Sequence, residues 1–164
     1  MRFLKLIFVS IALLFVLASI IGMLLSSRVL VSRAVNVEQY RDSIMPYLKD
    51  INQWRAWMEG MEDTAVTVYS ATEAKLGSSH VQVRSVTDTT VVTEWTPRSG
   101  TAQTATMYLI GNNARKITVV QWQFEQKLKW YPWERLGSMM NDKILGTMME
   151  KNLNRLKQLA EQSR

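Results

Sequence analysis

Residues 6–25 form a run of twenty positions without a charged side chain, LIFVSIALLFVLASIIGMLL. As an α-helix, a run of this length extends about 30 Å, which matches the hydrocarbon core of a bilayer. Fourteen of its residues are Leu, Ile, Phe or Val, and each favours insertion by about 0.3–0.6 kcal/mol near the helix centre. A signal peptide usually has an apolar region of only about 7–15 residues. The run therefore predicts a retained membrane anchor over residues 1–27.

The charges that flank this run are nearly balanced. Arg2 and Lys5 precede it, and Arg28 and Arg33 follow it. The short segment before the run is easily kept inside, which favours a cytoplasmic N-terminus. We therefore expect a single-pass membrane protein whose domain, residues 28–164, is extracytoplasmic, in the periplasm if the source is bacterial. The lipid bilayer is its first expected partner.

Composition excludes several kinds of site. The chain has no cysteine and one histidine, so it has neither a thiol nucleophile nor the ligands of a common zinc site. Its net charge is +6, but the basic residues are scattered among acidic ones, without the runs typical of nucleic-acid tails. No phosphate-cradling loop or nucleophile elbow is present. We expect no metal, no cofactor and no nucleic-acid partner.

The remaining residues predict one sheet followed by one long helix. The segment 28–37 alternates as a strand, and Pro46 is expected to divide the next segment into two short helices. Period-two patterns rich in Val, Thr, Tyr and Trp then predict antiparallel strands over 64–73, 80–86, 90–96, 102–111 and 114–126. The last pattern, 132–162, is helical. Its expected apolar stripe consists of Leu136, Met140, Ile144, Met148, Leu156 and Leu159 or Ala160, with Leu153 shifting its centre.

A helix this long must bury its stripe against the sheet. The predicted class is therefore α+β, with a curved antiparallel sheet that wraps around a long C-terminal helix and one transmembrane helix before it. The two short helices are expected to close one end of the space between sheet and helix.

Three stretches carry a resemblance to a known superfamily. They are DINQWRAW (50–57), ITVVQW (117–122) and the terminal helix with its Met-rich first half, Gly146 and closing Leu-x-x-Leu-Lys. In their order and spacing, the chain resembles a membrane-anchored member of the SRPBCC superfamily (START/Bet v 1-like, polyketide cyclase/dehydrase-like). The resemblance covers residues 28–162 and implies a helix-grip domain with an apolar cavity. That superfamily has no universal catalytic set to transfer to this chain.

The chain departs from that superfamily at two places. The usual glycine-rich hairpin is replaced by VTVYSATEAKLGSS, which suggests that one strand is missing. The usual ending after the tryptophan pair is replaced by MEGME. Both changes bear on the size and openness of the cavity.

The candidate ligand-binding residues are large apolar side chains expected around that cavity. Tryptophan usually serves packing when buried, and methionine either fills a core or forms an adaptable pocket wall. The candidates are Trp54, Trp57, Met58, Trp95, Tyr108, Trp122, Met140, Ile144 and Met148.

Three functions remain open on the sequence. The first is a non-catalytic, membrane-tethered domain that binds an apolar or lipid-like small molecule between sheet and helix. The second is a tethered protein-interaction module with a collapsed cavity and an unknown protein partner. The third is a cyclase- or dehydratase-type enzyme, which requires that Glu94, Glu125, Tyr69 or Tyr108 lines a cavity.

Overall fold

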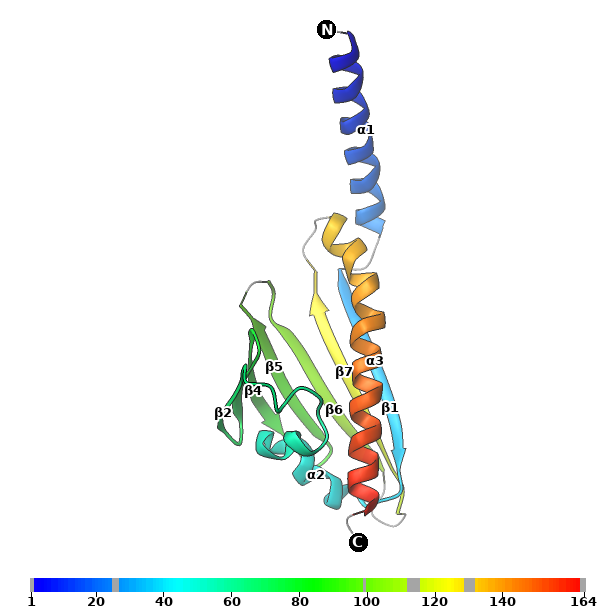
Figure 1. The fold of residues 1–164 in the computed structure, drawn as a ribbon. Coiled ribbons are helices and arrows are strands. Elements are labelled where there is room, and N and C mark those ends of the chain that lie inside the picture. The colour runs from blue at the N-terminus through cyan, green and yellow to red at the C-terminus, as the bar shows by residue number, and fades with distance from the viewer. Residues whose placement is uncertain (1, 25–26, 99, 112–115, 129–131, 163–164) are drawn as a thin grey trace.

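The computed structural model describes residues 2–24, 27–98, 100–111, 116–128 and 132–162. The side chains of 2, 22–24 and 132–142 lie outside this description. An N-terminal helix, α1 (Arg2–Leu24), precedes an α+β domain (Figure 1). Within that domain a seven-stranded sheet curves around the C-terminal helix α3 (Pro132–Gln162), which confirms the helix-grip prediction.

The sheet is antiparallel throughout, in the order β1-β7-β6-β5-β4-β3-β2. Its strands are β1 (Arg28–Val37), β2 (Val66–Ser70), β3 (Glu73–Leu76), β4 (Ser79–Val86), β5 (Thr90–Pro97), β6 (Gln103–Gly111) and β7 (Thr118–Lys127). Consecutive strands from β2 to β7 are neighbours because short loops join them. The first strand crosses to the far edge and pairs with the last.

The expected strand 64–73 is wrong in one respect, because the structure has a hairpin there. Strands β2 and β3 are joined at Ala71 and Thr72, so no strand is missing. The turn contains no glycine; instead the Ser70 hydroxyl accepts a hydrogen bond of 3.2 Å from the Thr72 amide. Ser and Thr make such turns through their side chains, which is a weak sequence signal.

The expected break at Pro46 is also wrong. Pro46 lies inside α2 (Arg41–Lys49), and the break falls at Asp50, which begins the 3₁₀ helix η1 (Ile51–Ala56). A proline inside a helix costs one hydrogen bond and crowds the carbonyl four residues earlier, so tertiary packing must hold α2 together. Ile44 and Leu48, both fully buried on either side of it, anchor α2 to the core.

Helix α3 packs on β1 with only part of the expected stripe: Leu153, Leu156 and Ala160 are buried, whereas Ile144 and Met148 are exposed. Its buried positions are Gly146, Met149, Asn152, Leu153, Leu156 and Ala160. Ile144 is 70% exposed, because the neighbouring buried positions Gly146 and Met149 lie on another side of the helix. Arg33 of β1 explains the local fit: its guanidinium occupies the place where a Cβ on Gly146 would lie, and its Nε donates to Glu150 over 2.6 Å.

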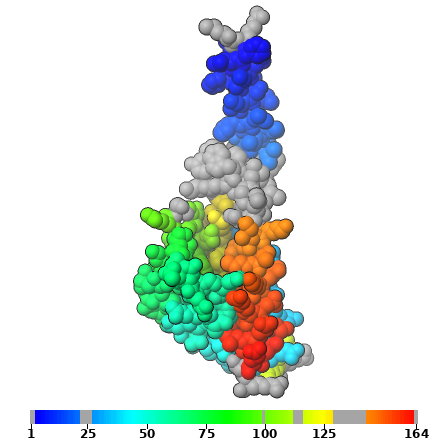
Figure 2. All heavy atoms as spheres, viewed as in Figure 1, coloured from blue at the N-terminus to red at the C-terminus, as the bar shows by residue number. Residues whose placement is uncertain are grey.

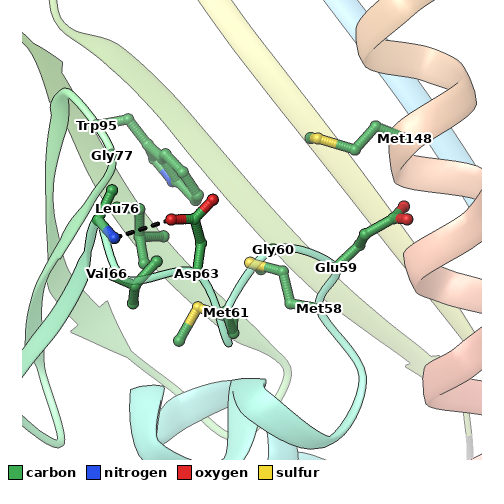
Figure 3. A pocket seen from close by; sticks show the side chains of 11 residues that line it. Met58, Glu59, Gly60, Met61, Asp63, Val66, Leu76, Gly77, Trp95 and Met148 are labelled. Carbon is green, nitrogen blue, oxygen red and sulfur yellow. Dashed lines mark hydrogen bonds between the residues drawn. The ribbon is translucent and has the colours of Figure 1, made fainter.

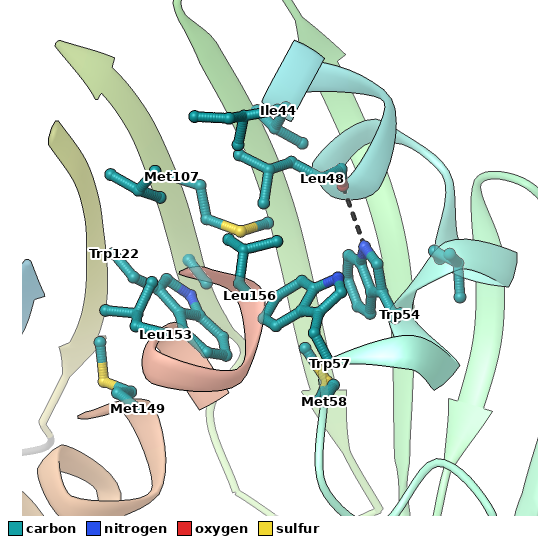
Figure 4. Packing of buried hydrophobic residues seen from close by; sticks show 14 of the residues in the cluster. Ile44, Leu48, Trp54, Trp57, Met58, Met107, Trp122, Met149, Leu153 and Leu156 are labelled. Atoms are coloured by element: carbon teal, nitrogen blue, oxygen red, sulfur yellow. Dashed lines mark hydrogen bonds between the residues drawn. The ribbon is translucent and has the colours of Figure 1, made fainter. Parts of the chain in front are cut away.

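The core between sheet and helix combines aliphatic and methionine side chains with a group of aromatic ones (Figure 4). We call Trp54, Trp57, Trp95, Trp122 and Phe124 the aromatic cluster. Their ring contacts form a closed circuit with centroid separations of 6.2 Å (Trp54–Trp57), 6.3 Å (Trp54–Trp95), 5.9 Å (Trp57–Trp122), 5.4 Å (Trp95–Phe124) and 5.6 Å (Trp122–Phe124). The cluster therefore occupies the middle of the space that a large ligand cavity would need.

Candidate ligand pocket

The aromatic cluster displaces the available space toward the β2–β3 edge of the domain. A pocket of about 260 Å³ lies there, bounded by the loop after η1, the ends of β2, β3 and β5, and one side chain of α3 (Figure 3). Its walls are mostly apolar. The lining residues are Met58, Glu59, Gly60, Met61, Asp63, Ala65, Val66, Leu76, Gly77, Trp95 and Met148.

The volume sets a limit on what fits. If a water molecule takes about 30 Å³, the pocket holds roughly nine groups of that size. It is smaller than most sites for drug-sized ligands, which measure about 300–1,000 Å³. An alkyl segment or a small ring system fits this space.

In Figure 2 the surface is hollowed between the green residues of the sheet and the orange, described part of α3. Met148 is 37% exposed, and Ile144, one turn earlier on the same helix, is also exposed. Larger hollows elsewhere on the described surface have polar borders; one of about 570 Å³ lies beside Lys75, His80 and Arg98. The first pocket differs from that hollow in its mostly apolar lining.

Three of the predicted site residues line the pocket, and three others are buried in the core. Met58, Trp95 and Met148 line the pocket. Trp54, Trp57 and Trp122 are buried in the aromatic cluster and do not line it. The indole nitrogens of Trp54 and Trp57 donate to the Leu48 and Tyr47 carbonyls over 2.9 and 3.0 Å. This pair therefore serves the packing of α2 and η1.

The other three predicted site residues do not line the pocket. Tyr108 lies on the outer face of β6, because it alternates with the buried Met107 and Leu109. Ile144 is exposed to solvent, because Gly146 and Met149 form the buried side of that part of α3. The side chain of Met140 lies outside the described residues.

The loop 58–65 contributes more to the pocket than the sequence predicts. MEGMED (58–63) supplies Met58, which was a predicted site residue, and also Glu59, Gly60, Met61 and Asp63, which were not. Met61 is almost fully buried. Gly60 has a φ of +82°, a left-handed conformation that glycine adopts without strain. A glycine between two Met-acidic pairs was the available signal for a tight loop.

Glu59 fastens this loop to α3. Its amide donates to the Asn152 side-chain oxygen over 2.9 Å, and its carboxylate accepts from Lys151 over 2.6 Å, with Arg155 at 3.9 Å. The hydrogen bond from Lys151 holds the pKa of Glu59 below its ordinary value, and the charges of Lys151 and Arg155 act in the same direction. The loop is thus held across the gap between sheet and helix.

We expect Glu59→Gln to lower the thermal midpoint of the full chain at pH 7, and added salt to reduce this small difference. Because the folded pKa is depressed, the ionic contribution is present above the ordinary glutamate pKa of about 4.3 and is lost as pH falls through the folded value. Thermal unfolding from pH 7 to pH 3 checks this. Glu62→Gln, which changes the same charge in the same loop, is the control; a difference for Glu59→Gln that persists at pH 3 contradicts an ionic role.

The residues required by the enzyme hypothesis lie on the outer face of the sheet. Glu94 pairs with Arg84 over 2.8 Å, and Glu125 lies 3.5 Å from Arg28. Tyr69 is exposed, and Tyr108 faces outward on β6. None of the four lines the apolar pocket, so the expectation on which that hypothesis depended is wrong. Within the described residues, no group of His, Cys, Asp and Glu could hold a metal ion.

Comparison with solved structures identifies the fold. A START superfamily protein from Mycobacterium smegmatis matches with a TM-score of 0.62 at 16% identity, over 82% of this chain and 99% of that one. The di-domain ARO/CYC BexL from the BE-7585A biosynthetic pathway matches with a TM-score of 0.60 at 12% identity, over 84% of this chain and 51% of that one. The chain therefore has the helix-grip fold shared by START-like and polyketide cyclase-like proteins.

DynU16, a protein of the dynemicin biosynthetic locus, matches with a TM-score of 0.58 at 14% identity over 82% of this chain. The chain spans about half the length of DynU16 and of BexL, 48% and 51% respectively. No protein-family model matches the sequence, and no curated protein matches it. At these identities the similarity establishes the fold.

The helix α1 is long and apolar enough to cross a membrane over Phe3–Ile21, where its mean hydropathy is 2.7 and none of it is buried in the domain. A signal sequence has the same properties. Only three residues, 25–27, separate the end of α1 from the start of β1. The domain thus begins within roughly 14 Å of the apolar helix, since an extended chain spans at most about 3.6 Å per residue.

Proposed function

We propose that this protein is a membrane-tethered, non-catalytic domain that binds the apolar part of a small lipid-like molecule in the pocket beside Trp95. The observation that carries this proposal is the pocket itself, in which Met58, Met61 and Met148 supply flexible apolar walls at the end of a helix-grip core. Methionine adapts to variable apolar shapes, and few polar groups interrupt the lining.

The register of the sheet supports delivery from the bilayer. Trp95 pairs with Gln103, Gln103 with Gln126, and Gln126 with Val29. Trp95 therefore lies in the same row of the sheet as the second residue of β1, which follows α1 closely. If α1 spans the membrane, Trp95 therefore lies in the part of the sheet toward the bilayer, which supports entry of a single-chain molecule from that side.

Filling the pocket tests the proposal. We expect Ala65→Trp to remove an apolar species that copurifies with the full chain, because the new indole occupies the space beside Val66 and Leu76. Organic extraction of the purified full chain followed by mass spectrometry measures the bound species, and a tenfold loss is expected. Thr67→Trp, on an exposed position of β2, is the control. Equal recovery from both variants, or none from the wild type, contradicts binding in this pocket.

A tethered protein-interaction module is the second candidate, and the aromatic cluster favours it because that cluster fills much of the usual cavity. This candidate predicts a stoichiometric protein partner in pull-downs from solubilised membranes. It also predicts that Ala65→Trp leaves the partner bound.

A further inference from the structure

The charged side chains of the pocket are all acidic. Among the residues that line it, only Glu59 and Asp63 carry a charge, and no Lys, Arg or His is present. Figure 3 shows the two carboxylates on opposite sides of the loop: Glu59 points toward α3, and Asp63 lies beside the ring of Trp95. The polar part of any ligand in this pocket therefore meets carboxylate groups.

The two carboxylates differ in their partners. Glu59 is engaged by Lys151, Arg155 and Asn152 of α3. Asp63 has no cation within 4 Å in the described part of the chain. Its Oδ1 accepts from the Ala65 amide over 2.9 Å and from the Thr64 hydroxyl over 3.4 Å. Both bonds hold the turn through the same oxygen, which leaves Oδ2 available.

Trp95 adds a second attraction for positive charge. Its indole lines the pocket next to Asp63, while Trp54 stacks against it from the core with the ring planes 10° apart. An aromatic face within about 6 Å attracts an ammonium group, and quaternary ammonium ions are commonly bound between aromatic and acidic side chains. An anionic head would instead be repelled by an unpaired carboxylate on an apolar wall.

We propose that Asp63 and Trp95 select the head of the bound molecule, so that the pocket takes a single-chain amphiphile bearing an ammonium group and rejects one bearing a carboxylate. The proposal rests on the proposed function, since it assigns the polar end of a ligand whose apolar end occupies the same pocket. The Coulomb difference between attraction and repulsion at a partly exposed carboxylate corresponds to about a three- to tenfold preference.

The test uses photoreactive alkyl compounds of one chain length, with a diazirine near the chain end, that differ only in the head: trimethylammonium, hydroxyl, carboxylate or phosphocholine. The full chain in lipid nanodiscs is irradiated with each compound, and labelled peptides are quantified by mass spectrometry. Labelling of 58–65 is divided by labelling of α1, which corrects for partitioning into the bilayer. We expect the trimethylammonium compound to label 58–65 about three to ten times more than the carboxylate compound.

Asp63→Asn is the decisive variant, because asparagine keeps an oxygen for the Ala65 amide and removes the charge. We expect it to abolish most of the ammonium preference while labelling by the hydroxyl compound stays unchanged, which shows that the pocket persists. Glu62→Gln is the matched control and should keep the preference. The phosphocholine compound separates two sources: strong labelling assigns the ammonium to a lipid headgroup, and weak labelling assigns it to a free amine.

One result would contradict the selection of the head group by Asp63, and another would contradict binding in the pocket. Equal labelling by ammonium and carboxylate compounds, or an unchanged preference in Asp63→Asn, overturns the selection by Asp63 and leaves the apolar pocket standing. Absence of labelling in 58–65 by all four compounds overturns the proposed function itself.

Discussion

Replacing Trp122 by alanine is expected to lower the free energy of unfolding of the domain by about 3–5 kcal/mol. Trp122 is fully buried on β7 and contacts both Trp57 and Phe124. Its removal therefore eliminates two of the five ring contacts of the aromatic cluster and leaves a cavity there. The cavity can close only if α3 moves toward the sheet. Urea unfolding of the full chain in nanodiscs, followed by circular dichroism, measures the change.

The control for this substitution is Gln123→Ala, one residue along the strand on the outer face of the sheet. It should change the free energy of unfolding by no more than about 0.5 kcal/mol. A comparable loss in both variants would mean that β7 itself, and not the aromatic cluster, determines stability here.

A pair of milder variants separates packing from hydrogen bonding. The indole nitrogen of Trp122 is buried and has no partner within the described residues, so Trp122→Phe removes no hydrogen bond. Trp54→Phe, in contrast, leaves the Leu48 carbonyl unpaired, which costs about 1–3 kcal/mol beyond the lost contact area. Trp54→Phe is therefore expected to be the more destabilising of the two.

Placing two arginines in α1, Leu14→Arg with Leu17→Arg, is expected to release the protein from membranes. Each exchange near the centre of a spanning helix costs about 3 kcal/mol, so the pair removes roughly 6 kcal/mol of the insertion free energy. The fraction of protein that stays in the pellet after an alkaline carbonate wash measures the effect. The wild type should stay in the pellet, and the double variant should move to the supernatant.

Leu30→Arg is the matched control, because Leu30 is exposed on the outer face of β1 and lies beyond α1. It should remain in the pellet. Retention of α1 can be read from the mass of the purified chain, which is 18.9 kDa with the helix present. Recovery of a shorter chain in the supernatant of wild-type samples would identify α1 as a cleaved signal sequence and contradict the tether.

Strand positions could be predicted from the sequence where alternation and glycine turns coincide. The inner face of β7, with Thr118, Val120, Trp122 and Phe124, follows directly from a period of two, and the structure confirms it. The β2–β3 hairpin could not be predicted, because its turn depends on the Ser70 and Thr72 side chains and contains no glycine or asparagine. Local signals of that strength do not distinguish a tight turn from a continuous strand.

The site was only partly predictable because it depends on contacts between distant segments. The close approach of Arg33 to Gly146, which places this side of α3 against β1, joins two residues more than a hundred positions apart. The pair Trp54 and Trp57 is conspicuous in the sequence, yet its neighbours Trp95 and Trp122 come from other strands. Periodicity assigns each of these residues to a face, but it does not show that together they would fill the centre and move the pocket to its edge.

The methionine methyl groups offer the most direct measurement of the central claim, that the pocket beside Trp95 binds an alkyl chain. Met58, Met61 and Met148 line the pocket, whereas Met107 and Met149 are buried and do not line it. The sample is the full chain in nanodiscs, labelled with ¹³C at its methionine methyl groups. Titration with a medium-chain alkyl alcohol should shift the first three signals in a saturable way and leave the other two unchanged. Absence of a saturable shift at all three, or equal shifts at all five, would contradict the claim.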